Sequence, residues 1–390
     1  MDKLRKIYLA FTVIFTAAAV YLLLFVAKQV NNNEVCPGED FIYFAGAAFF
    51  TFAVFYMLID FMLLWNLKGW KKAAAVVLCV FIILTGLEMS LRYFEYLYPP
   101  IYRRSPALLW ELTPNLTGAP DNDESYRINT NVMGLRCGEI SPIKETDEFR
   151  ILIIGDSTAF GWLLDERETF AYRLERKLRL QEQGKGLKIR VLNGAVCGYS
   201  SLQGLEFMRE KGWKLSPDLI IAAFNNDPTA DYVEDEKRMP PTRMMPLLNF
   251  LNRFRIYSLV RDLTVKSRIN PEDDEIIPPG KGTARVSKSR YGEIYESLCE
   301  QAKSRGAGLI IVSLPLKEEM RKYPGMEDYR GILKDCAERN GVLFLDEYKK
   351  WQGPQWEGLF MDPMHPTGKG HEIISKDLEE LINRENLLRK

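Results

Sequence analysis

The feature that most constrains the fold is a regular alternation of two kinds of segment that begins at residue 150. Short apolar runs rich in β-branched residues alternate with longer stretches that carry a helical pattern of apolar residues. The apolar runs and the helical patterns lie, in chain order, at Arg150–Ile154, Thr169–Gln183, Ile189–Leu192, Leu202–Lys214, Leu219–Phe224, Ser287–Arg305, Leu309–Leu314, Met326–Asn340, Val342–Leu345 and Gly368–Arg389. Almost continuously apolar strands that alternate with helices are typical of a parallel sheet with helices on both faces. Five strands therefore predict an α/β fold, a flavodoxin-like three-layer sandwich with a five-stranded parallel sheet.

One interval, 228–286, breaks this alternation because it contains no clear strand. It includes an amphipathic stretch at Leu247–Val265 and follows the third apolar run. An insertion after a strand lies at the carboxyl edge of such a sheet, where α/β proteins bind ligands. Two interpretations stay open: a helical cap over a substrate, or a packed helical excursion that ends in a loop.

The residues before position 95 have a different composition, with three long apolar stretches at 7–27, 41–65 and 73–94. The first stretch has no charged residue and is long enough to cross a bilayer core of about 30 Å. A cleaved signal peptide is the alternative, but its apolar core would be shorter. The second stretch contains only Asp60 and the third Glu88, which can pair with Arg92 one helical turn later. We expect three transmembrane helices that anchor the chain in a lipid bilayer.

The loops between these stretches predict their orientation. Basic residues precede the first stretch and separate the second from the third, whereas the loop 29–40 is acidic. The positive-inside rule then places the N-terminus in the cytoplasm and everything after the third crossing outside. Residues 95–147, rich in Pro, Asn and Asp, are expected to form an extended connector. The remaining residues, 148–390, are expected to form the catalytic domain.

Charge and cysteine usage exclude several classes of partner. The chain has 52 basic and 52 acidic residues and a formal net charge of zero, without a basic stripe that would bind nucleic acid. The six cysteines include no Cys-x-x-Cys pair, and there are only two histidines. A zinc site is therefore not expected, and no metal or organic cofactor is predicted.

The scarce histidines single out a candidate for nucleophilic catalysis. Ser157, in Gly155-Asp156-Ser157, directly follows the first apolar run and so lies at the carboxyl end of the predicted sheet. His365 follows Asp362 by three residues, after the last predicted strand. A serine nucleophile needs a base, and the base needs an acid that orients it. His371 has no such acid and is expected at the surface.

Acyl transfer also needs hydrogen-bond donors for the developing oxyanion, and two strand ends offer them. Gly198 follows the second apolar run and can present its backbone N–H without obstruction by a side chain. Asn225 and Asn226 follow the third run and offer side-chain amides. Taken singly, these residues are also typical of ordinary turns. Their order along the chain and their places at strand ends favour the functional interpretation.

Ser157, Gly198, Asn226 and His365, in this order, resemble the four blocks of the SGNH (GDSL-type) hydrolase superfamily over about 148–390. The resemblance implies a flavodoxin-like sandwich in which Ser157 is the nucleophile, His365 the general base and acid, and Asp362 its orienting acid. It also implies an oxyanion hole formed by Ser157, Gly198 and Asn226.

Two positions depart from the family pattern. Thr158 replaces the leucine of Gly-Asp-Ser-Leu, and the third block lacks its leading glycine, which leaves Asn225 as a second candidate donor. The segments 155–162 and 131–136 (Asn-Val-Met-Gly-Leu-Arg) resemble membrane-anchored bacterial members of the superfamily.

The sequence thus predicts a membrane-anchored serine esterase or O-acyl hydrolase that acts outside the cytoplasm. Its expected substrate is an acyl ester of a cell-envelope glycan or lipid. Two alternatives stay open. The same triad would serve an O-acyltransferase of a surface polysaccharide, and the same anchor would serve an inactive scaffold for envelope assembly, against which the intact residues argue.

Overall fold

The computed structural model describes residues 69–97, 101–118, 126–228, 230–231, 234–238, 242–266, 283–322 and 325–389. The chain divides into two compact units. The smaller unit comprises Met1–Pro99 and Phe250–Ile269, and the larger unit comprises Pro100–Asn249 and Asn270–Lys390. The apolar stretches 7–27 and 41–65 lie outside the described residues.

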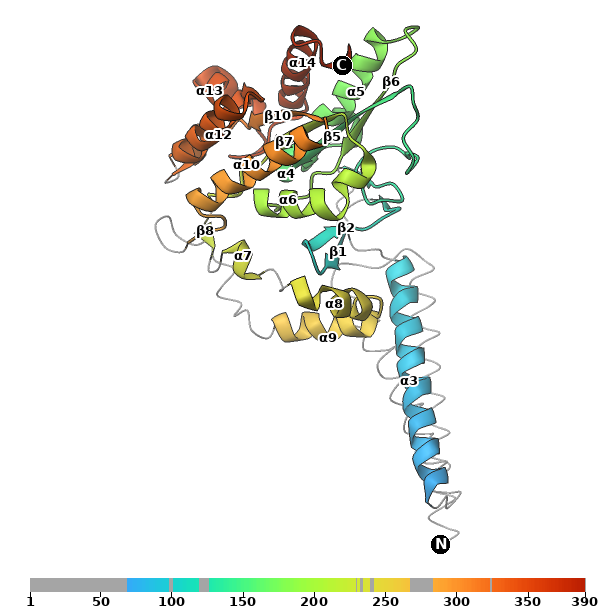
Figure 1. Cartoon of the computed structure of the whole chain (residues 1–390). Helices are drawn as coiled ribbons and strands as arrows, with labels where there is room; N and C mark the ends of the chain where they lie inside the picture. The colour runs from blue at the N-terminus through green and yellow to red at the C-terminus, as the bar shows by residue number, and fades with distance from the viewer. Residues whose placement is uncertain are drawn as a thin grey trace. The chain divides into compact units, whose positions relative to one another are not determined.

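The centre of the larger unit is a five-stranded parallel sheet with the order β11-β10-β7-β5-β6 (Figure 1). Its strands are β5 (Glu148–Gly155), β6 (Lys188–Asn193), β7 (Leu219–Ala223), β10 (Gly308–Ser313) and β11 (Leu343–Asp346). The predicted five-stranded parallel sheet is confirmed, and each strand coincides with one of the apolar runs. The chain moves from β5 outward to β6 and then returns to β7 on the other side of β5. Ligands bind at the carboxyl ends of strands where the order reverses in this way.

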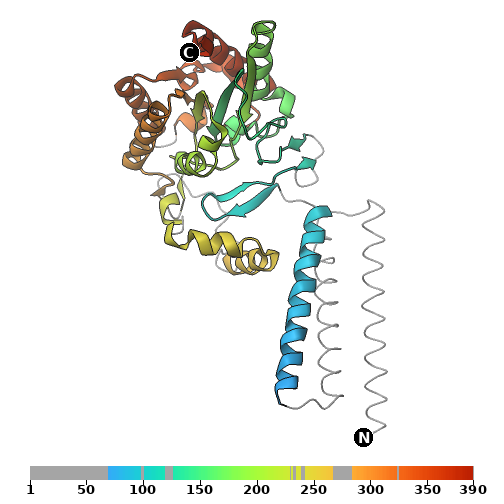
Figure 2. The same cartoon turned by 45° about the vertical axis from the view of Figure 1, so that its right-hand side comes forward.

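Two groups of helices pack around this sheet (Figure 2). Helix α5 packs against α14, whereas α10 packs against both α6 and α12. These helices are α5 (Phe170–Gln181), α6 (Ser201–Glu210), α10 (Lys288–Ser304), α12 (Met326–Asn340) and α14 (Gly368–Arg384). Two of the predicted helices are longer than the observed ones. The range predicted as Leu202–Lys214 ends as α6 at Glu210 and continues in a 3₁₀ turn at Gly212–Leu215. The range predicted as Gly368–Arg389 ends as α14 at Arg384 and is followed by a 3₁₀ turn at Leu387–Arg389.

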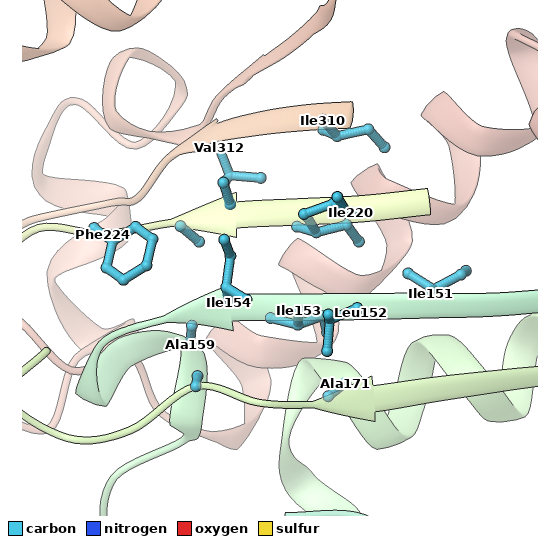
Figure 3. Close-up of a cluster of buried hydrophobic side chains, with 14 of the residues drawn as sticks. Ile151, Leu152, Ile153, Ile154, Ala159, Ala171, Ile220, Phe224, Ile310 and Val312 are labelled. Carbon is cyan, nitrogen blue, oxygen red and sulfur yellow. The ribbon is translucent and has the colours of Figure 1, made fainter. Parts of the chain in front are cut away.

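The central strands are buried on both faces, which explains why their sequences do not alternate between apolar and polar residues. The side chains Ile151 to Ile154 of β5 are at most 1% exposed, and all of β7 is buried. They pack against Ile310 and Val312 of β10 and against helices on either side (Figure 3). Each such side chain stabilises the fold by about 1.5–3 kcal/mol.

Of the segment 95–147, expected as an extended connector, residues 95–97 belong to the helix Trp70–Leu97 and the described residues from 101 on belong to the larger unit (Figure 2). Strands β1 (Tyr102–Ser105) and β2 (Leu109–Leu112) form an antiparallel hairpin, and β3 (Thr117–Gly118) pairs with β4 (Ile128–Asn129). Seven buried hydrophobic side chains of this segment belong to the same core as the sheet: Leu108, Leu112, Leu116, Tyr126, Ile128, Leu135 and Ile140. The sequence hides this packing because these residues are separated by turns and have no helical or strand period.

The described part of the smaller unit contains α3 (Trp70–Leu97) and α9 (Arg255–Lys266), which contact each other. Glu88 and Arg92 form the expected pair at 2.8 Å. The Glu88 carboxylate also accepts the backbone N–H groups of Arg255 at 3.0 Å and Ile256 at 3.1 Å. It therefore caps the first turn of α9, whose N–H groups have no partner within the helix. Among the residues described, no helix combines the length and the apolar character that crossing a membrane requires.

In its described part, the interval 228–286 contributes no strand to the five-stranded sheet. It forms α7 (Asp235–Arg238), α8 (Met245–Leu251) and α9. Its two ends meet in a short antiparallel pair, β8 (Ala230–Asp231) with β9 (Thr283–Ala284). We call this pair, with Arg285 after it, the neck of the insertion.

Candidate active site

Ser157 stands at the start of a short helix, α4 (Ser157–Phe160), which begins two residues after β5 ends. Asp156 caps this helix, because its Oδ1 accepts the N–H of Thr158 at 2.9 Å. The turn requires a glycine at 155, since a Cβ there would lie 2.3 Å from the carbonyl oxygen of Ala223. The close approach of β5 to β7 therefore fixes the place where Ser157, half-buried, emerges from the sheet.

Hydrogen bonds join the three strand ends around Ser157. The Asp156 Oδ2 accepts the N–H of Asn225, after β7, at 2.5 Å. The N–H of Val196, after β6, donates to the carbonyl of Gly155 at 3.1 Å. Complete burial raises the pKa of Asp156, although hydrogen bonds from Asn225 and Thr158 favour the carboxylate. This buried side chain holds the loops after β5 and β7 in register.

Asp362 and His365 occupy a loop just before α14, and the carboxylate is fixed by three hydrogen bonds. Its Oδ2 lies 2.6 Å from His365 Nδ1. Its Oδ1 accepts the backbone N–H groups of Met364 and His365, each at 2.8 Å. Partial burial raises the pKa of Asp362, but these hydrogen bonds outweigh it, so that the pKa lies below its ordinary value. The side chain is therefore a carboxylate at neutral pH, and it accepts a hydrogen bond from the protonated Nδ1 of His365.

The other ring nitrogen of this histidine faces the serine. His365 Nε2 lies 2.8 Å from Ser157 Oγ, although 208 residues separate the two in the chain. Thr158 Oγ1 donates to the carbonyl of Met364 at 3.3 Å and so ties the two loops together. With Nδ1 protonated, Nε2 accepts the hydroxyl proton. The structure thus brings Ser157, His365 and Asp362 into one hydrogen-bonded chain.

The candidate oxyanion donors lie at the neighbouring strand ends. Gly198, after β6, is half-buried and has a φ of +78°. Asn226, after β7, donates from its side-chain nitrogen to the carbonyl of Tyr199 at 3.2 Å, which fixes its amide beside the Gly198 loop. Asn225 Nδ2 is buried and has no hydrogen-bond partner among the described residues. Both asparagines therefore remain candidates.

His371 is not a surface residue, contrary to the sequence-based expectation. It is 1% exposed, its ring stacks on Phe170, and its Nδ1 accepts the N–H of Phe170 at 3.0 Å. It lies on the face of α14 that packs against α5. Burial, together with the positive charges of Arg136 and Arg173, lowers its pKa to about 3. It is a neutral hydrogen-bond acceptor that links two helices.

Sequence reasoning assigned no role to Arg136, which supports the nucleophile turn. This buried side chain donates from Nη1 to the carbonyls of Phe160 and Gly161, both at 2.8 Å, and lies 4.4 Å from the centre of the Phe160 ring. These carbonyls form the C-terminal end of α4. The motif 131–136 was the available signal, but its partner segment lies 24 residues further on.

Cys197 directly precedes Gly198 in the loop after β6. Burial raises the pKa of the Cys197 thiol to about 12, so that it is not a thiolate at neutral pH. No group of three or more His, Cys, Asp or Glu side chains within the described ranges is arranged as a metal site.

The solved structures to which this chain is similar include three hydrolases. LAE5, an α/β hydrolase from the metagenome of Lake Arreo, is 15% identical with a TM-score of 0.40, covering 62% of this chain and 97% of that one. The lipase/acylhydrolase from Enterococcus faecalis is 12% identical with a TM-score of 0.41, covering 61% and 96%. A catalytic mutant of Axe2, an acetylxylan esterase from Geobacillus stearothermophilus, is 18% identical with a TM-score of 0.39, covering 62% and 96%. No curated protein matches the chain.

A family model gives the assignment. Residues 153–373 match the GDSL-like Lipase/Acylhydrolase family, and this range is more than half of the 390 residues. It begins within β5, just before Ser157, and ends within α14, just after His365. The chain therefore belongs to the GDSL-like lipase/acylhydrolase family and is a serine ester hydrolase.

Proposed function

We propose that this enzyme hydrolyses carboxylic esters through Ser157, His365 and Asp362. The single observation that carries the proposal is the chain of two short contacts, 2.8 Å from Ser157 Oγ to His365 Nε2 and 2.6 Å from His365 Nδ1 to Asp362 Oδ2. It has the geometry that a nucleophile, a base and an orienting acid require.

The reaction proceeds in two halves. Ser157 Oγ attacks the ester carbonyl while His365 Nε2 takes the hydroxyl proton. His365 then returns this proton to the departing alcohol, and the acyl group stays on Ser157. In the second half His365 takes a proton from water, the hydroxide attacks the acyl carbon, and the proton returns to Ser157 as the acid leaves. Asp362 stabilises the imidazolium in both halves and keeps Nδ1 protonated.

We assign the oxyanion to three donors at the carboxyl ends of β5, β6 and β7. The backbone N–H of Ser157 lies at the start of α4, where N–H groups have no partner within the helix. The N–H of Gly198 is not shielded by a side chain of its own. The amide of Asn226 completes the set, with Asn225 as the alternative for this third donor. Replacement of one such donor is expected to lower kcat about 10²–10³-fold.

The test uses the full-length chain purified in detergent, with a short activated ester and a fluorophosphonate probe. The native protein should cleave the ester and become labelled at Ser157, whereas Ser157→Ala should do neither. Ser289→Ala is a matched control, because Ser289 is an exposed residue of α10. Equal turnover by Ser157→Ala and the native protein would show that the assignment is wrong.

Hydrolysis and acyl transfer are distinguished by the second half of the reaction. The acyl enzyme is common to both, and the acceptor is water in one and a sugar hydroxyl in the other. Incubation with an acyl donor and a glycan acceptor, followed by mass spectrometry, identifies the product. Free acid alone supports the hydrolase, and an acylated glycan supports the transferase.

We further infer that the apolar N-terminal stretches attach the enzyme to a membrane, with 148–390 outside the cytoplasm. The uncharged stretch 7–27 and the distribution of basic residues support this inference. In α3, large apolar side chains are exposed, among them Val77, Phe81, Leu84 and Met89. The acyl esters within reach would then be those of envelope glycans and lipids.

Reporter fusions test this topology one crossing at a time. A phosphatase that is active only outside the cytoplasm should be active when fused after residue 35, inactive after residue 69 and active at the C-terminus. Activity after residue 69 or inactivity at the C-terminus would contradict the orientation. The last fusion also decides whether 73–94 crosses the membrane.

A further inference from the structure

Gly198 is flanked by two peptide groups, and side chains from outside the sheet hold both of them. One group joins Cys197 to Gly198 and carries the N–H assigned to the oxyanion. The other joins Gly198 to Tyr199 and carries the Gly198 carbonyl. With its φ of +78°, Gly198 has a backbone conformation that other residues rarely adopt. Because glycine is conformationally permissive, the directions of its two flanking peptide groups depend on the contacts that hold them.

Trp110 of β2 holds the first peptide group. Its indole Nε1–H donates to the carbonyl oxygen of Cys197 at 3.0 Å. The C=O and N–H of one peptide group are coplanar and point in opposite directions, so a bond that fixes the oxygen also fixes the direction of the Gly198 N–H. A hydrogen bond to the oxygen also polarises the peptide and strengthens its N–H as a donor.

Trp110 is itself held in place. Its ring packs edge-on against Tyr199, with centroids 5.7 Å apart, and the Tyr199 hydroxyl donates to the Trp110 carbonyl at 2.6 Å. The ring also covers the glycine, because a Cβ on Gly198 would lie 3.1 Å from Trp110 Cζ2. The hairpin β1–β2 therefore presents Trp110 to the Gly198 loop as a fixed part of the unit.

Arg285, in the neck of the insertion, holds the second peptide group. Its Nη1 donates to the carbonyl of Gly198 at 2.6 Å. The guanidinium is oriented by Asp235, whose fully buried carboxylate lies 2.8 Å from Nη2 and 3.3 Å from Nε. Its Nη2 also donates to Gln203 Oε1 at 3.1 Å.

We propose that Trp110 and Arg285 are positioning residues that preorganise the oxyanion hole by fixing the two peptide groups of Gly198. This inference rests on the proposed function, because it needs the Gly198 N–H to bind the oxyanion. Trp110 lies outside the matched family range, 153–373, whereas Arg285 lies within it, at the end of the insertion. The segment before the sheet and the neck of the insertion thus converge on one donor.

The test replaces the indole N–H while it keeps an aromatic ring. In the full-length chain, Trp110→Phe should lower kcat for a short activated ester about 10- to 100-fold and leave KM within twofold. The reason is that the indole hydrogen bond orients the Gly198 N–H, which binds the oxyanion in the transition state more strongly than the ester carbonyl in the ground state. The affinity for a boronic acid, which forms a tetrahedral adduct with the serine, should fall by a similar factor. Trp213→Phe is the matched control, since it also removes an indole hydrogen bond, to Gln301 at 2.9 Å, but at a distance from Gly198.

A purely structural role for Trp110 would give a different result. It would lower the melting temperature but leave kcat and the boronate affinity of the folded protein unchanged, and that outcome would overturn the inference. Arg285→Lys provides a second variant, which keeps the charge beside Asp235 but removes the fork that reaches Gly198. It should also lower kcat and boronate affinity together. If the native chain itself neither turns over ester nor labels at Ser157, the proposed function fails, whereas normal activity in both variants refutes only this inference.

Discussion

Asp156 and Asn225 join the ends of two neighbouring strands, because the fully buried Asp156 Oδ2 accepts the Asn225 N–H at 2.5 Å. The other oxygen of the same carboxylate caps α4 through Thr158. One side chain therefore sets both the start of the helix that carries Ser157 and the position of the loop that carries the third oxyanion donor. Asp156 therefore positions two parts of the site although it does not itself contact the reacting atoms.

Asp156→Asn should weaken this support. An amide has one acceptor oxygen, so one of the two buried N–H groups loses its partner, at a cost of about 1–3 kcal/mol. We expect the urea midpoint to fall and kcat to drop at least about tenfold, because a small displacement of a catalytic group lowers the reaction rate strongly. Asp328→Asn, at an exposed position, should change neither quantity. Native kcat in Asp156→Asn would show that the two loops keep their places without this carboxylate.

Asp362→Asn should remove most activity while the fold persists. The amide either donates to Nδ1 or accepts from it, and it no longer stabilises the imidazolium, so we expect kcat to fall about 10³–10⁴-fold. Asp362 is 38% exposed, so the melting temperature should change by only a few degrees. Steady-state kinetics and thermal unfolding give both values. A variant that retains more than a tenth of native kcat would contradict the role assigned to Asp362.

Arg136→Met should destabilise the turn after the nucleophile. Its guanidinium bonds the carbonyls of Phe160 and Gly161, and methionine fills the space without replacing a donor. The two carbonyls would keep only longer bonds, from Asn193 Nδ2 to Phe160 at 3.4 Å and from the Leu164 N–H to Gly161 at 3.2 Å, so we expect a loss of about 1–3 kcal/mol in urea unfolding. The comparison is Arg305→Met, an exposed arginine over Trp213. Equal stability of Arg136→Met and the native chain would mean that these carbonyls find other donors.

A chain that starts at residue 148 should not fold, although the family match begins only at residue 153. It lacks Leu108, Leu112, Leu116, Ile128 and Leu135, all buried in the core of the sheet. At about 1.5–3 kcal/mol each, their loss is comparable to the whole stability of a typical domain, about 5–15 kcal/mol. A chain of residues 101–390 keeps these side chains and should unfold cooperatively. Cooperative unfolding of 148–390 would show that the hairpins are dispensable.

The sheet and the meeting of Ser157, His365 and Asp362 at its edge could be predicted because their signals are local and strong. The run Ile151–Ile154 is apolar throughout, as expected of a strand buried on both faces. His365 is the third residue after Asp362, so one turn brings the two side chains together. Ser157 follows a strand end directly, and parallel strands share one carboxyl edge. In these cases the sequence pattern and the tertiary position have the same cause.

The remaining features depend on contacts that no local pattern encodes. Trp110 and Gly198 are far apart in the chain, and only the packing of the β1–β2 hairpin brings them together. The apolar residues from Leu108 to Leu135 are interrupted by prolines and asparagines, which predict turns but not the core beneath them. The absence of a nearby acid and the position near the start of the last helix predict a surface place for His371, but neither takes account of the helix face on which it lies. Its position four residues after Thr367, the N-cap of α14, puts it on the inner face of that helix.

His371 should make the protein lose stability in acid. Its pKa is about 3 in the folded state and about 6.5 when unfolded, so below pH 6.5 the unfolded chain binds a proton that the folded chain does not. The stability that neutral His371 contributes is complete above pH 6.5 and falls with pH by up to about 1.4 kcal/mol per unit. His371→Asn, which can still accept the Phe170 N–H, should therefore lose less stability than the native chain between pH 7 and pH 4.5, by roughly 2 kcal/mol. Urea unfolding at these two pH values measures the difference, and Ser289→Ala, an exposed substitution that leaves both histidines in place, should keep the native acid sensitivity. Parallel pH profiles for His371→Asn and the native chain would mean that the buried imidazole accepts its proton without unfolding.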